Sequence, residues 1–463
     1  MKRIPPDPLP PGHDPAWPTP RERNAGALFG FCLALIVMKL GNPVIFASRP
    51  GQAWDPLAAP ASLHEALIAT WPVSWGYALL ALLGVAALLQ WRRPASGWPW
   101  PGLLLVGWLG WQVVSATQTV DAALTRATVL HFAGCVACAA VGWGGWSGLR
   151  DLRPVWLGLG AGVLVVLATA WDQHFGGLER TRAAFLQLPE AVRARIDSPE
   201  FRVKLSSQRV FGTFVYPNAL AGGVLLLVPP VLAALWTWRR RPQAGRALAV
   251  LLGVAAAGAL YWSGSKSGWL LALGLGALAL MAAPLRPFLR WTCLAVLLGA
   301  GLLAFLGRHA GYFEKGASSL AARRDYWRVA WTLTEARPLL GYGPGTFQVP
   351  YRELKPPEAE MARLAHNDYL QQGCDAGVPA LLLYAGFIGV SLVALRPAFL
   401  RVGSRPGGGG GGEPVATAVW LGLLGFAGQG MVEFGLYIPA LAWPFFLFLG
   451  WAWGRRSAGP ATA

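Results

Sequence analysis

One polar segment, residues 323–377, combines residue types that could carry out a group transfer. It contains the adjacent cations Arg323 and Arg324, a glycine-rich run over Gly341–Gly345, and a histidine at position 366. Arginine binds phosphate oxygens through two parallel hydrogen bonds, and a neutral imidazole can accept a proton from a hydroxyl group. Together these residues predict transfer from an anionic donor to a hydroxyl acceptor.

His366 is followed by Asn367 and Asp368, a sequence typical of a helix start. Asn is a favourable N-cap, Asp is favoured in the first turn, and Gly377 would close this helix. The positive end of the helix dipole disfavours a charged imidazolium, so the ring is expected to stay neutral and accept a proton. The alternative is a histidine that only hydrogen-bonds within its loop.

Two further cations lie at predicted membrane boundaries. Arg209 comes shortly before a long apolar run, and Lys266 lies in the turn Ser263–Gly268. Each could be an interfacial anchor whose charge reaches the lipid headgroups. In the functional interpretation, both cations face the same outer cavity.

The elements that must position these residues are membrane helices. The chain is 54% hydrophobic and 13% charged, whereas soluble domains carry about 25% charged residues. A membrane span needs about 20 apolar residues, which predicts an all-α polytopic membrane protein of about twelve spans. The predicted spans are 26–47, 71–91, 98–116, 127–146, 154–172, 214–238, 247–263, 267–284, 291–307, 378–396, 415–434 and 438–454.

The positions of the Lys and Arg residues predict the orientation. Outside the two long loops, most of them lie in the N-terminal tail, the C-terminus and alternate short loops, which the positive-inside rule places in the cytoplasm. Both termini are therefore predicted to be cytoplasmic, and loops 173–212 and 308–377 to lie outside, the second before the tenth helix. We expect a disordered tail over 1–24, a single membrane domain over 25–456 and a short tail over 457–463.

Several other functions are disfavoured by the sequence. The net charge of +17 is spread over many short loops, which does not predict a nucleic-acid surface. Cys135 and Cys138 have redox-motif spacing but lie in an apolar span, which favours a packing role. The sequence has neither an Asp-x-Asp pair nor zinc-type Cys/His spacing, so we expect no metal and no cofactor. The glycine-rich run also lacks the lysine of a nucleotide-binding loop.

At these residues the chain resembles the O-antigen ligase and O-antigen polymerase family of bacterial envelope proteins. The resemblance covers most of the chain, and its most specific part is the late block that ends at the histidine. The matching residues are Arg209, Gly212, Phe214 and Asn218, the Ser265–Lys266 turn, Pro338–Phe347, and His366 with Asn367.

The resemblance implies a fold related to the C-type glycosyltransferases. It implies transfer of a glycan from an undecaprenyl pyrophosphate carrier at the periplasmic face of the bacterial inner membrane. The acceptor is lipid A–core in ligases and another carrier-linked repeat in polymerases. We expect inversion at the donor sugar, because the acceptor would attack the face opposite the diphosphate.

The resemblance also implies residue roles. His366 would be the general base, and Arg323, with Arg324 beside it, would bind the pyrophosphate together with Arg209. Lys266 stands where the family often has arginine, which keeps the charge but loses two-point phosphate binding. Two asparagines of the matching segments complete the predicted substrate-binding set, namely Asn218 and Asn367.

Four alternatives stay open. A polymerase differs from a ligase only in its acceptor, and a protein-glycosylating ligase would use a protein acceptor. Another member of the superfamily could use an acid of the first outer loop as base, for which Asp55 and Glu65 are the candidates. A polysaccharide or lipid-carrier transporter would place polar residues at the membrane midplane, where Lys39 is the one basic residue predicted inside a span.

Overall fold

The computed structural model describes residues 19–46, 66, 69–91, 98–187, 190, 206–314, 318–397, 400 and 414–457. Within these ranges the secondary structure is entirely helical, in agreement with the predicted all-α class. The predicted alternative bases Asp55 and Glu65, most of the N-terminal tail, part of loop 173–212 and nearly all of the C-terminal tail lie outside the described residues.

Within the described residues, a helix forms at each of the twelve predicted apolar segments, and three more, α7, α14 and α15, form in the two long loops. Many of these helices begin with proline, whose fixed φ suits the first helical position. Their bounds are α1 Pro20–Lys39, α3 Val73–Leu89, α4 Pro101–Ser115, α5 Ala122–Ala140, α6 Arg153–Asp172, α7 Leu178–Gln187, α10 Pro217–Trp236, α11 Pro242–Ser263, α12 Lys266–Ala282, α13 Pro287–Glu314, α14 Ser318–Ala336, α15 Gln348–Leu354, α16 Asp368–Leu395, α17 Pro414–Gln429 and α18 Pro439–Ser457.

The apolar helices make this a multi-pass membrane protein. In the described part of the chain, six helical stretches are long and apolar enough to cross a bilayer, and three shorter apolar helices accompany them. The six are Ala122–Trp146, Arg153–Gln187, Pro217–Trp236, Pro242–Ser263, Pro287–Gly311 and Asp368–Leu395. Twelve spans and cytoplasmic termini stay predictions.

The predicted tail ends earlier than expected. Thr19 accepts a hydrogen bond from the backbone N–H of Glu22 at 3.2 Å, and the Glu22 carboxylate accepts one from the Thr19 N–H at 3.0 Å. This reciprocal capping box satisfies two N–H groups that a helix start otherwise leaves unpaired. The first helix therefore begins at Pro20, so 20–24 are helical rather than part of a disordered arm.

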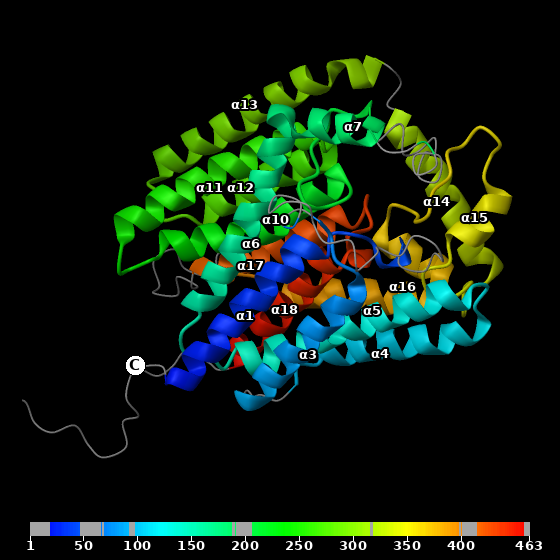
Figure 1. Ribbon diagram of the computed structural model, residues 1–463, viewed down its shortest axis with the longest axis horizontal. Helices are drawn as coiled ribbons and strands as arrows, with labels where there is room; N and C mark the ends of the chain where they lie inside the picture. Colours follow the sequence, from blue (N-terminus) through cyan, green and yellow to red (C-terminus); the bar gives the residue numbers. More distant parts are fainter. Residues whose placement is uncertain are drawn as a thin grey trace, which may run out of the picture.

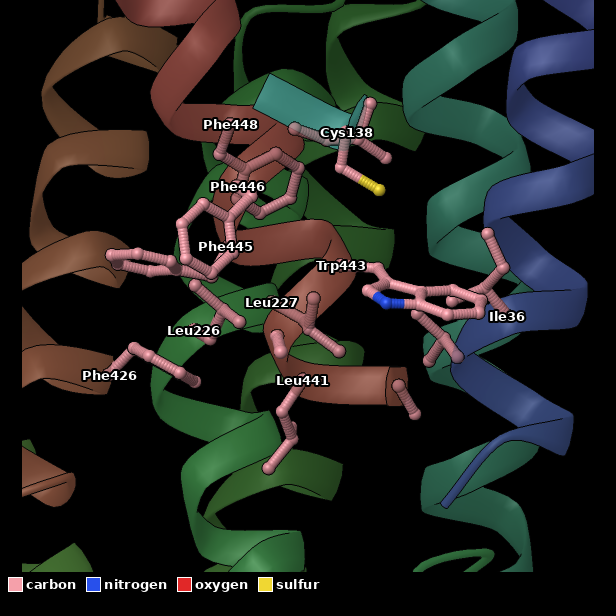
Figure 2. Packing of buried hydrophobic residues seen from close by; sticks show 14 of the residues in the cluster. Ile36, Cys138, Leu226, Leu227, Phe426, Leu441, Trp443, Phe445, Phe446 and Phe448 are labelled. Atoms are coloured by element: carbon pink, nitrogen blue, oxygen red, sulfur yellow. The ribbon is translucent and has the colours of Figure 1, made fainter. Parts of the chain in front are cut away.

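Aromatic side chains of α18 fill the centre of the helix bundle. Trp443, Phe445 and Phe446 are almost fully buried, and they pack toward α1, α10 and α17 (Figures 1 and 2). Helix α1 packs along α6, and α16 along α4. At the α1–α6 crossing, a Cβ on Gly158 would lie 2.4 Å from the Cα of Gly30, so glycine permits this close backbone approach.

Helix α13 lies at the periphery of the bundle and packs mainly against α12 (Figure 1). Many of its large apolar side chains are exposed, among them Phe288, Trp291 and Leu303. In a membrane protein such a surface faces lipid rather than water.

Two helix ends shape the region where the polar residues gather. Helix α16 is interrupted at Ala376 and Gly377, where Gly377 has φ +80°, so the predicted helix closure at Gly377 is confirmed and the predicted span follows at once. Helix α17 ends at Gln429, before the predicted end of the span 415–434. Residues 430–438 instead form a connection to α18, which we call the α17–α18 loop.

Candidate functional site

The site is built around a glutamate of the α17–α18 loop. Glu433 is 5% exposed and forms an ion pair with the Arg323 guanidinium of α14. The same guanidinium donates from Nε to the backbone oxygen of Val432 at 3.1 Å. These two interactions fix α14 against the α17–α18 loop.

Asn218 joins this ion pair to a second arginine. Its Nδ2 donates to Glu433 Oε1 at 2.6 Å, and its Oδ1 accepts from Arg209 Nη2 at 2.7 Å. Arg209 Nε also donates to the backbone oxygen of Ser263, at 2.6 Å. The two predicted phosphate-binding arginines, which are far apart in sequence, are therefore linked to one carboxylate, Arg323 directly and Arg209 through Asn218.

Lys266 lies close enough for the charges of Arg209, Arg323 and Arg308 to act on it. It opens α12, whose N-cap Ser265 accepts a hydrogen bond from the Gly268 N–H. Burial lowers the pKa of Arg209; Glu433 raises it and Arg323 lowers it. Three cations and a single carboxylate thus share this region, an excess of positive charge that suits an anion such as a phosphate group.

His366 contacts the other oxygen of the same glutamate. Its Nδ1 lies 3.4 Å from Glu433 Oε2. The ring stacks on Tyr326 with centroids 5.5 Å apart and meets the edge of Phe434 at 4.8 Å. The histidine side chain is 27% exposed, so it is held by its neighbours yet accessible from solution.

The backbone of His366 has a strained conformation. Its φ is +51°, and no other described non-glycine residue has a positive φ. Such a conformation costs about 1–3 kcal/mol and persists where surrounding contacts hold it. Here Trp327 Nε1 donates to the His366 carbonyl oxygen at 3.4 Å. Strain of this kind at a polar cluster is typical of functional sites.

Asn367 is the N-cap of α16, as predicted. Its Oδ1 accepts from the N–H groups of Tyr369 and Leu370, each at 3.0 Å. Its Nδ2 donates to the backbone oxygen of Met431 at 2.8 Å, so the residue also holds the α17–α18 loop beside His366. Arg324 is exposed on α14, unlike Arg323 next to it.

Glu433 was not among the residues predicted from the sequence. It was assigned to the end of a membrane span, although it is the single acidic residue in 414–457. An acid within an apolar segment is itself a signal of function. Burial raises the pKa of Glu433, but the hydrogen bond and charge of His366 and the charge of Arg323 lower it, and the net pKa is below the ordinary value.

The glycine-rich run forms a turn anchored on α16. Gly341, Gly343 and Gly345 have φ values of +61°, +107° and +77°, a region of backbone conformation that glycine adopts without steric cost. The Gly345 N–H donates to Asp375 Oδ2 at 2.8 Å, and the Phe347 N–H to Oδ1 at 3.1 Å. In this structure the run acts as a scaffold for the segment between α14 and α16.

The fold and site define a helical membrane protein with a basic, histidine-containing cluster. Residues 249–385 match the family model described as O-antigen ligase. This range contains Lys266, Arg323 and His366, whereas Arg209, Asn218 and Glu433 lie outside it. The predicted resemblance is therefore confirmed over these residues, and the matching family is of the O-antigen ligase or polymerase type, a glycosyltransferase-like class of membrane enzyme. A comparison with curated proteins gives no match.

Proposed function

We propose that this protein transfers a glycan from undecaprenyl pyrophosphate to lipid A–core, or a similar hydroxyl acceptor, at the periplasmic face of the inner membrane. The observation that carries the proposal is the contact of His366 with Glu433, whose other oxygen pairs with Arg323. One carboxylate thus joins a proton acceptor to a cation suited to a diphosphate.

His366 is the general base in this proposal. Glu433 contacts Nδ1, so Nε2 takes the proton of the acceptor hydroxyl. A carboxylate beside Nδ1 selects the tautomer that carries its proton on Nδ1, and it stabilises the imidazolium that forms. The acceptor oxygen then bonds to the anomeric carbon of the donor sugar, with inversion.

Arg209, Arg323 and Lys266 stabilise the leaving group. The bond from the anomeric carbon to the diphosphate oxygen breaks, and the electron pair leaves with the lipid-linked diphosphate. Arginine forks match phosphate oxygens, and fixed charges act most strongly where water is scarce. Three cations supply this stabilisation, so the proposal requires no metal ion and no cofactor.

The test is glycan transfer by the purified protein in lipid with a carrier-linked oligosaccharide donor. Lipid A–core and carrier-linked repeat are offered separately. Product on lipid A–core that is lost in His366→Ala supports the ligase, and product on carrier alone identifies a polymerase. Transfer that persists in His366→Ala, but is lost in Asp55→Asn or Glu65→Gln, makes one of those acids the base.

The adjacent arginines provide a matched comparison. Arg323→Ala removes the partner of Glu433 and should abolish transfer, whereas Arg324→Ala changes an exposed neighbour and should retain it. If neither acceptor is glycosylated, a protein acceptor is offered and vesicles are assayed for flipping of the carrier. Carrier translocation without glycan transfer would replace this proposal with a transporter.

A further inference from the structure

A chain of buried hydrogen bonds leads from the interior of the fold to the residue before His366. The Ala365 N–H donates to Gln371 Oε1 at 2.7 Å, and Gln371 Nε2 donates to Asp375 Oδ2 at 2.8 Å. Ala365, Gln371 and Asp375 are at most 1% exposed. We propose that Gln371 and Asp375 are positioning residues that hold His366 in its active conformation, an inference that rests on the proposed function.

The carboxylate of Asp375 anchors the inner end of this series of hydrogen bonds. Besides Gln371, its carboxylate accepts the N–H groups of Gly345 and Phe347 and, at 3.1 Å, the hydroxyl of Tyr437. Its hydrogen bonds thus come from the glycine turn, from its own helix and from the α17–α18 loop. Because the glycine turn and the α17–α18 loop both hold the carboxylate, it fixes the Gln371 amide in turn.

The Gln371 amide binds the backbone directly before the strained residue His366. It holds the peptide nitrogen of Ala365, directly before the positive φ of His366. Trp327 holds the His366 carbonyl, and the Asn367 cap fixes the next residue. Without the Gln371 bond, the backbone can relax toward negative φ, which would turn the imidazole away from Glu433.

The neighbouring amide, Gln372, offers a matched control. Gln372 is also buried, accepts from Trp108 Nε1 at 2.8 Å and Gln112 Nε2 at 2.9 Å, and donates to the Tyr437 hydroxyl at 3.2 Å. Its bonds connect α16 to α4 and to the α17–α18 loop rather than to Ala365. Gln372 shares Tyr437 with Asp375, but only Gln371 binds Ala365, which is the contact that matters for the proposal.

The experiment compares Gln371→Met with Gln372→Met in the full-length protein in lipid. Each removes a buried amide at nearly constant volume, so both should lower the unfolding temperature by a similar amount. Gln371→Met should lower kcat for glycan transfer about 100-fold with little change in donor KM, the scale of loss for a misplaced catalytic group. Gln371→Glu, which in its protonated form offers the same acceptor and one donor, should recover part of kcat at mildly acidic pH.

Histidine-selective isotope labelling supplies a measurement that does not depend on turnover. The His366 ring resonance, assigned with His366→Ala, should shift in Gln371→Met and stay in place in Gln372→Met. If both methionine variants lose activity in proportion to stability, or both leave the resonance unchanged, the positioning role is refuted. A wild type that transfers no glycan refutes the proposed function instead, and the resonance comparison still decides the role of Gln371.

Discussion

Glu433 Oε2 lies 3.4 Å from His366 Nδ1, although the two residues are 67 positions apart in the chain. The other oxygen of Glu433 binds Arg323 and Asn218. A single carboxylate therefore orients the proposed base and organises the proposed diphosphate-binding side chains. The expected consequences can be measured separately.

Glu433→Gln should lower kcat about 100-fold, the scale associated with loss of effective general-base catalysis. The amide cannot stabilise a charged imidazolium as a carboxylate does. Steady-state transfer kinetics check this expectation, with Glu358→Gln as control because Glu358 is an exposed acid of the predicted outer loop 308–377. Equal kcat for Glu433→Gln and the wild type would remove Glu433 from the mechanism.

Stability should depend on pH through the same glutamate. The pKa of Glu433 in the folded protein lies below its ordinary value of 4.5, so its ionised form stabilises the fold above that pH. The contribution is lost as the pH falls through the depressed folded-state pKa. Thermal unfolding in detergent should show the wild type more stable than Glu433→Gln at neutral pH, with the gap closing only below about pH 4.5. A gap that closes near pH 6 would contradict this assignment.

Arg209→Lys should weaken donor binding more than catalysis. The guanidinium binds Ser263 and Asn218 at once, and an ammonium group cannot reproduce that fork or bind phosphate at two points. We expect donor KM to rise about tenfold, in line with the loss of one good hydrogen bond. Arg180→Lys, a change to an exposed arginine, is the control and should leave KM unchanged.

Gly345→Ala should destabilise the protein by on the order of 2 kcal/mol. The residue has φ +77°, and a Cβ there would lie 2.1 Å from Thr128 Oγ1. Gly389→Ala tests the same change in α16 where nothing lies within 4 Å, and it should be nearly neutral. Urea or thermal unfolding of both variants gives the comparison, and equal stability of the two would show that the glycine turn is not strained.

The helices could be predicted because apolar residues dominate each of the twelve runs. Their ends could not, as Glu433 shows: hydropathy averages over a window and cannot tell the last turn of α17 from the loop after it. Asn367 was predicted as a cap because capping is local to its own sequence. In contrast, the partners of Gln371 and Asp375 come from segments that only the folded chain brings together.

Among the site residues, too, residue types and motifs could be predicted from the sequence, whereas their packing could not. Arg209, Arg323 and His366 were predicted from residue type and family motifs, and the structure brings them together around Glu433. Adjacent residues such as Arg323 and Arg324 could not be separated by sequence, since only the packing of α14 decides which one faces the α17–α18 loop. The positive φ of His366 could not be predicted either, because histidine has no strong preference for that conformation.

The hydrogen bonds from the first turns of α16 also restrict the length of the chain between His366 and Gly377. Each added residue would rotate the helix beyond it by about 100°. One insertion would then point the position 371 side chain away from Ala365, or the position 375 carboxylate away from the glycine turn. This interval should therefore accept conservative replacements in evolution while excluding single-residue insertions and deletions.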